Sequence, residues 1–118
     1  MDARARSNCM HELAISQGIV ESVCEAVPEG KVLAVTIEIG ALSGVVSDSV
    51  RFCFDACARG TRLEGARLDV VDVPGLGRCG SCRREMAMAE LVGRCACGNP
   101  FLEVLRGREL RIRSVEVT

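Results

Sequence analysis

The feature that most constrains this chain is a group of four cysteines in its second half. They form a Cys79-Gly-Ser-Cys82 pair and a Cys95-Ala-Cys97 pair, with twelve residues between the pairs. Two short cysteine turns that face each other can place four thiolates about 2.3 Å from one tetrahedral zinc ion. The pattern therefore predicts a structural zinc site. A redox dithiol and an iron site use similar pairs, and the C-x-C pair is one residue shorter than the usual turn.

The other four of the eight cysteines carry no comparable pattern. The chain starts Met-Asp-Ala-Arg-Ala-Arg-Ser-Asn and shows no apolar segment typical of a secretory signal, so we expect a reducing cytoplasm rather than a disulfide framework. Cys24, Cys53 and Cys57 lie on apolar helical stripes and are predicted to be buried thiols. Cys9 belongs to the segment that precedes the first predicted element.

Length and charge exclude several classes of function. A chain of 118 residues has the size of one ordinary domain. Fifteen basic and sixteen acidic side chains give a net charge of −1, which argues against binding to nucleic acid. Tyr and Trp are absent, so base-stacking platforms are not expected. No apolar run approaches the roughly 18 residues of a membrane helix, and we expect no membrane association.

Hydrophobic periodicity predicts two helices and three strands. Apolar side chains recur every fourth residue within a helix at 11–27, and Pro28 ends it. Alternation predicts a strand at 31–39 with Leu33 on its apolar face. Ser47, Asp48 and Ser49 offer N-cap oxygens to a second helix, which Gly60 closes. Further strands are predicted at 68–73 and 110–117.

These elements predict an α+β fold: a small mixed three-stranded sheet with two helices on one face, plus an inserted zinc-ribbon-like module. We expect residues 1–9 to be a disordered N-terminal extension. Residues 10–74 and 107–118 would form an α/β domain, and residues 75–106 the inserted zinc-binding domain, which is too small to fold without its metal. The predicted core consists of Ile15, Ile19, Val23, Val35, Ile37, Phe54, Val70 and Ile112.

The single histidine, His11, is followed directly by Glu12 near the start of the first predicted helix. One interpretation is an exposed residue beside a carboxylate that complements the helix dipole. The other is a metal ligand, because imidazole suits nickel, zinc and copper. A catalytic base is not favoured, since no nucleophile motif accompanies it.

Several segments in order resemble the HypA/HybF family of hydrogenase maturation nickel chaperones. They are the Met-His-Glu-Leu sequence at 10–13, the strand end at 39–43, the helix segment at 50–54, the segment 61–71, the paired cysteines and the last strand at 110–117. The resemblance extends over residues 10–117. Nine residues precede Met10, where family members usually start, and Val46 stands where relatives often carry an acidic residue.

The resemblance implies a nickel metallochaperone and not an enzyme. His11 would bind Ni(II) transiently through its imidazole and amide nitrogens, with Glu12 contributing at least its amide. Cys79, Cys82, Cys95 and Cys97 would hold structural Zn(II). Implied partners are a HypB-type GTPase and the large subunit of [NiFe]-hydrogenase, with urease maturation proteins and a homodimer as further options. Two alternatives stay open at this point: a zinc-ribbon module that binds nucleic acid or a transcription protein, and a redox protein that uses the Cys79–Cys82 pair.

Overall fold

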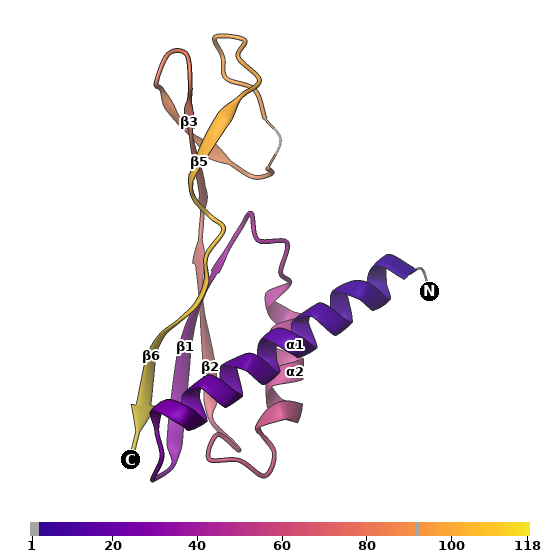
Figure 1. Cartoon of the computed structure of the whole chain (residues 1–118), viewed down its shortest axis with the longest axis vertical. Helices are drawn as coiled ribbons and strands as arrows, with labels where there is room; N and C mark the ends of the chain where they lie inside the picture. The colour runs from indigo at the N-terminus through magenta and orange to yellow at the C-terminus, as the bar shows by residue number, and fades with distance from the viewer. Residues whose placement is uncertain (1–2, 92) are drawn as a thin grey trace. The chain divides into compact units, whose positions relative to one another are not determined.

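The computed structural model describes residues 3–91 and 93–118, with side chains from residue 11 onward. In this part of the chain the helices are α1 (Ala3–Ala26) and α2 (Ser47–Ala58). The strands are β1 (Val32–Gly40), β2 (Arg67–Val73), β3 (Gly75–Cys79), β4 (Glu85–Met88), β5 (Leu102–Arg106) and β6 (Leu110–Val117) (Figure 1). Neither described helix is long and apolar enough to cross a bilayer. The side chain of Cys9 lies outside the described residues.

Helix α1 begins at Ala3, well before the predicted start at residue 11. Residues 3–6 alternate Ala and Arg, both of which favour helix, so the helix continues upstream of the predicted apolar stripe. At the other end, Pro28 disfavours helical geometry at the residue before it. The amide of Val27 makes the last bond, to the carbonyl of Val23 at 2.8 Å.

Helix α2 is capped differently from the prediction. Its N-cap is Val46, which makes no side-chain capping bond, so the predicted caps at Ser47, Asp48 and Ser49 are wrong. The carboxylate of Glu12, on α1, instead accepts the amide of Val46 at 2.9 Å. The predicted C-terminal end is confirmed, because Gly60 follows the helix in the left-handed region at φ +76°.

The first sheet has the strand order β2-β1-β6 and is mixed. Backbone bonds at the end of β1 reach both neighbours: the amide of Ala41 donates to the carbonyl of Val73 at 2.9 Å, and the amide of Gly40 to the carbonyl of Glu109 at 2.7 Å. The predicted α+β class is confirmed. Strand β6 begins and ends at the predicted residues.

The core lies where the helices meet this sheet. Of the predicted core residues, Ile19, Val23, Val35, Ile37 and Phe54 are buried, whereas the other three are half-buried. The expected place of Leu33 on the apolar face is wrong, since it is 44% exposed and Val32 and Ala34 are buried beside it.

The predicted inserted module forms a second sheet of order β4-β3-β5. Strand β3 pairs antiparallel with both neighbours, so that Gly77 lies opposite Met86 on one side and Val104 on the other. The four-cysteine segments lie beyond the end of β3 and between β4 and β5. The sheet thus fixes the place where Cys79 leaves its strand.

Three glycines meet where the chain enters and leaves this sheet. A methyl group at Gly40 would lie 2.0 Å from the carbonyl oxygen of Gly107, and one at Gly107 would lie 2.7 Å from the Cα of Gly75. Gly107 also has φ +112°, which side chains rarely adopt. The carbonyl of Gly107 accepts the amide of Leu42 at 2.7 Å. Only glycine allows these backbones to approach so closely.

The described residues form two compact units. One comprises α1 through Ile37 with Val45–Val70 and Ile112–Thr118, and the other comprises Glu38–Gly44 with Val71–Arg111. The sequence-based domain limits (1–9, 10–74 with 107–118, and 75–106) concern independent folding and disorder, and they stay a prediction.

Candidate metal centres

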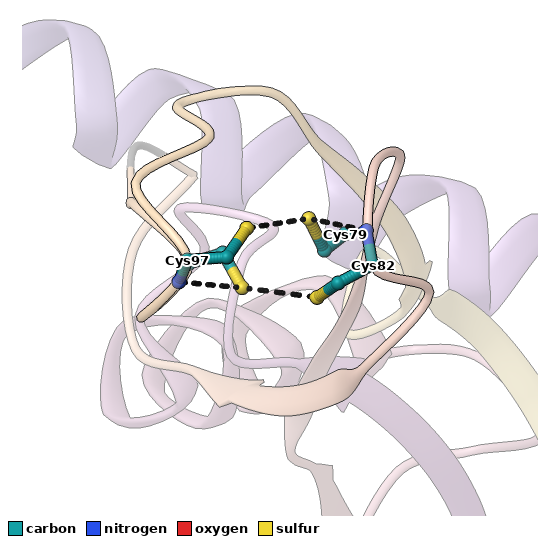
Figure 2. Close-up of side chains that lie close together, drawn as sticks. Cys79, Cys82 and Cys97 are labelled. Carbon is teal, nitrogen blue, oxygen red and sulfur yellow. Dashed lines mark hydrogen bonds between the residues drawn. The ribbon is translucent and has the colours of Figure 1, made fainter.

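Four cysteine sulfurs converge in the second unit. The Sγ atoms of Cys79 and Cys97 are 3.6 Å apart, those of Cys82 and Cys95 are 3.5 Å apart, and all four lie within 4.8 Å of one another (Figure 2). Tetrahedral thiolates at the usual zinc–sulfur distance would be separated by about 3.8 Å. The predicted group of four is therefore brought together with the spacing that one metal ion requires.

The first cysteine turn aims backbone amides at sulfur. The amides of Ser81 and Cys82 point to the Cys79 Sγ at 3.4 and 3.5 Å. The turn is closed by two bonds, from the amide of Arg83 to the carbonyl of Cys79 and from the amide of Cys79 to the carbonyl of Arg84. Arg83 adopts φ +61°, the only described non-glycine residue in that region. A side chain in this strained conformation marks how tightly the turn is wound.

The second turn is a version of the first with one residue fewer. The amide of Cys97 points to the Cys95 Sγ at 3.5 Å. Its closing bonds run from Gly98 to Cys95 and from Cys95 to Asn99, each spanning one residue less than in the first turn. Gly98, directly after the second cysteine, again has positive φ, at +97°. The C-x-C pair thus keeps the closing bonds and the left-handed residue.

The thiols of the cluster do not ionise alike. Hydrogen bonds from the Cys82 amide, from the side chain of Asn99 and from the Ser81 amide outweigh burial and lower the pKa of the Cys79 thiol to about 6. At Cys95 the Cys97 amide lowers the pKa, but burial and the neighbouring thiols outweigh it and raise that pKa to about 12. A cluster that accepts one negative charge and resists another needs a cation before all its thiols can ionise. The arrangement is that of a structural metal site.

Asn99 is a member of this site that the cysteine spacing did not reveal. Its Nδ2 approaches the Cys79 Sγ at 3.5 Å and also donates to the carbonyl of Phe101 at 3.3 Å, while its Oδ1 accepts the Phe101 amide at 3.1 Å. The sequence signal was weak: an amide side chain two residues after a Cys-x-Cys pair and before a proline. Such hydrogen bonds orient and stabilise thiolate ligands.

The other two predicted site residues lie in the first unit, on α1. His11 is exposed, whereas Glu12 is only 1% exposed, so adjacent positions on the helix direct their side chains differently. The Glu12 Oε2 accepts the Val46 amide, and its Oε1 is buried without a hydrogen-bond partner among the described residues. The structure therefore does not bring the imidazole and this carboxylate to one point.

The backbone at these two residues is helical. In an α-helix each amide donates to the carbonyl four residues earlier, so the amides of His11 and Glu12 fall within the intact part of α1. An amide nitrogen that binds a metal gives up both its proton and this bond. Metal binding there requires a rearrangement upstream of Glu12.

Comparison with known proteins identifies the family. A family model described as hydrogenase/urease nickel incorporation, metallochaperone, hypA, matches residues 10–117. A hydrogenase maturation factor HypA of Geobacter metallireducens is 51% identical over 110 residues, which are 92% of this chain and 99% of the relative. The corresponding protein of a Nostoc species is 46% identical over 108 residues, which are 92% of this chain and 96% of the relative.

Solved structures show the same fold. The solution structure of the nickel metallochaperone HypA from Helicobacter pylori superposes with a TM-score of 0.62 at 21% identity, and covers 90% of this chain and 96% of that one. A second solution structure of a HypA protein gives the same TM-score at 23% identity. The family match decides among the alternatives that the sequence left open. It favours the metallochaperone over a nucleic-acid-binding module and over a redox protein. The chain belongs to the HypA family and is a nickel metallochaperone for hydrogenase maturation, not an enzyme.

Proposed function

We propose that this chain carries Ni(II) at the start of α1 and Zn(II) in its four-cysteine cluster. His11 would bind nickel through its imidazole and amide nitrogens, and Glu12 through its amide. Cys79, Cys82, Cys95 and Cys97 would hold zinc permanently. The exposed position of His11, the one histidine of the chain, carries the nickel assignment.

The chemistry of the two donor sets supports this division. Four thiolates suit zinc, whereas a nitrogen-rich set suits Ni(II) or Cu(II), so one chain keeps two metals apart by ligand type. The sulfur cluster has the spacing of a closed site, with hydrogen bonds to two of its sulfurs. The imidazole is exposed on a helix surface, which suits a cargo ion that must be passed on.

Delivery requires partners that the family description names only in general terms. The chain would act in the cytoplasm, with a HypB-type GTPase, and would transfer nickel to the immature large subunit of [NiFe]-hydrogenase. Urease maturation proteins and a second copy of the chain are further partners in this proposal. Pull-down with each purified partner, with and without nickel, distinguishes them.

Helix α1 sets a condition on nickel binding. Because the amides of His11 and Glu12 lie inside the helix, their use as ligands requires residues 3–10 to unwind or to be absent. The helix and the metal thus compete for the same backbone nitrogens. We expect a roughly micromolar affinity, worth about 8 kcal/mol, which leaves the ion exchangeable.

Calorimetry with Ni(II) on the zinc-loaded protein tests the proposal. His11→Ala removes the only imidazole and is expected to weaken nickel binding at least 100-fold while one zinc ion per chain remains. Gln17→Ala, at another exposed position of α1, is the control and should bind nickel normally. Retention of nickel by the His11→Ala protein would show that the ion binds elsewhere.

A further inference from the structure

The buried face of α1 changes character along its length. Towards its C-terminal end it buries Ile19, Val20 and Val23. One and two turns earlier it buries Ser16 and Glu12, at 0% and 1% exposure, and these are the only polar side chains fully buried in the described part of the chain. The polar part of this face directly follows His11.

Both polar side chains bind the backbone of α2 in matching register. The Ser16 Oγ donates to the carbonyl of Val50 at 3.1 Å, and the Glu12 Oε2 accepts the amide of Val46 at 2.9 Å. The two contacts are four residues apart on each helix, so they join the first turn of α2 to a single turn of α1. Buried side-chain-to-backbone bonds of this kind specify one alignment, because any slip leaves polar groups unpaired.

The Glu12 contact takes the place of a missing cap. A capping box normally has an acidic side chain of the helix's own first turn accepting the N-cap amide. In α2 the N-cap is Val46, and that amide is bound by Glu12 from another helix. The Glu12 carboxylate therefore holds the start of α2 and, through the same bond, holds Glu12 itself in place beside His11.

We propose that the Glu12 carboxylate is a positioning group for nickel, not a nickel ligand. It anchors α1 at residue 12, so that the helix can unwind upstream and release the amide nitrogens without loosening its packing on α2. His11 then stands at the boundary between the anchored and the releasable part of the helix. This proposal rests on the nickel site at His11 and concerns only what the side chain of its neighbour does.

The second carboxylate oxygen distinguishes this role from ligation. Oε1 is buried and has no partner among the described residues, and Oε2 is occupied by the Val46 amide. A glutamine can still accept that amide through its oxygen, and a neutral amide group is easier to bury than a carboxylate. Glutamine does not replace a carboxylate as an anionic metal ligand.

Three variants separate the two roles. Glu12→Ala should weaken Ni(II) binding by about tenfold or more, because the anchor is lost. It should also accelerate hydrogen exchange of the Val46 amide in the nickel-free protein. Glu12→Gln should restore both properties to within about threefold of the original chain. Ser16→Ala removes the neighbouring contact, one turn from the site, and should lower the melting temperature without changing nickel affinity.

The measurements are Ni(II) calorimetry and amide exchange by NMR on the zinc-loaded protein. If Glu12→Gln protects the Val46 amide but loses nickel as fully as Glu12→Ala, the carboxylate is a ligand and the proposal is wrong. It is also wrong if Glu12→Ala exposes the Val46 amide yet binds nickel normally. Failure of the nickel site itself would appear separately, as normal binding by His11→Ala, while the amide exchange still reports on the anchor.

Discussion

The four-cysteine cluster and the start of α1 use their backbone amides in opposite ways. At the cluster, amides that the two turns leave free point at the sulfurs of Cys79 and Cys95 and make the ligands ready before a metal arrives. At His11 the amides are already committed to the helix, and a metal has to displace those bonds. The first arrangement favours retention of an ion. The second favours release.

The same difference appears in how many contacts define each site. Each cysteine turn is closed by two backbone bonds and carries one residue with positive φ, so the sulfur positions follow from the chain path. His11 is exposed, and the carboxylate of the next residue, Glu12, is buried and bound to the Val46 amide. A chaperone that exchanges one metal and keeps another needs both kinds of site.

The largest expected effect breaks the cluster. Cys95→Ala removes a buried ligand, and a structural zinc site supplies about 10–16 kcal/mol to the folding of a small module. We expect loss of the zinc ion and unfolding of the β3–β5 sheet, seen by metal analysis and NMR. Cys57→Ala, a half-buried thiol on α2 outside the cluster, should keep one zinc ion per chain. Full zinc content in the Cys95→Ala protein would contradict the four-ligand site.

A smaller effect tests the close backbone approach of Gly40 and Gly107 in the second unit. A methyl group at Gly40 would overlap the carbonyl of Gly107, so Gly40→Ala should lower the free energy of unfolding by about 3 kcal/mol, as overpacking does. Gly18, within α1, has open space around the same position. Gly18→Ala should raise stability by about 0.5–1 kcal/mol. Urea denaturation measures both, and equal behaviour of the two variants would refute the close approach.

The next effect concerns competition between helix and nickel. A chain that starts at Met10 lacks the carbonyls that accept the amides of His11 and Glu12 within α1, and it places a free amine beside His11. Removal of one or two helical hydrogen bonds, each worth about 1 kcal/mol, should tighten nickel binding roughly tenfold. Zinc content should not change. Equal nickel affinity of the two chains would mean that the upstream helix does not compete.

Apolar periodicity and cysteine spacing predicted much of this molecule, because both are local. The apolar stripe containing Ile19 and Val23 indicated α1, and the paired cysteines indicated the cluster. The shorter C-x-C turn is accommodated with Gly98 at positive φ. The burial of Glu12 was not predicted, because periodicity counts apolar residues only. Its partner is the amide of Val46, 34 residues away. A backbone group carries no signal in the sequence.

The error at the start of α2 has the same origin. Ser47, Asp48 and Ser49 have good capping side chains, and local preference placed the cap on them. The actual N-cap is Val46, since a carboxylate from α1 binds its amide. A tertiary contact overrides local preference here, at the start of α2, which is bound by the residue next to His11. The start of α1 differs for another reason: residues 3–6 are Ala and Arg, which favour helix, and periodicity of apolar residues does not register them.

The smallest expected effect is one of pH, and it again separates the two regions. The Glu109 carboxylate accepts the amide of Gly107 at 2.7 Å, and this bond, helped by other nearby amides and by Arg111, lowers the pKa of the carboxyl below its usual 4.5. A carboxyl with a lowered pKa stabilises the folded state above its unfolded pKa. That stabilisation disappears as the pH falls through the pKa of the folded state, so acid should weaken the bond between Glu109 and the Gly107 amide.

Glu109→Gln should therefore lower the unfolding free energy at pH 7 and approach the original chain in acid, which flattens the dependence of unfolding free energy on pH between about 5 and 3. Glu64→Gln, at an exposed position, controls for the loss of one acidic side chain. Chemical denaturation at each pH measures the slope. If both variants keep the original slope of unfolding free energy against pH, the Glu109–Gly107 contact does not stabilise the folded chain. If only Glu109→Gln flattens it, acid loosens the cysteine-bearing unit through a group that takes no part in binding either metal.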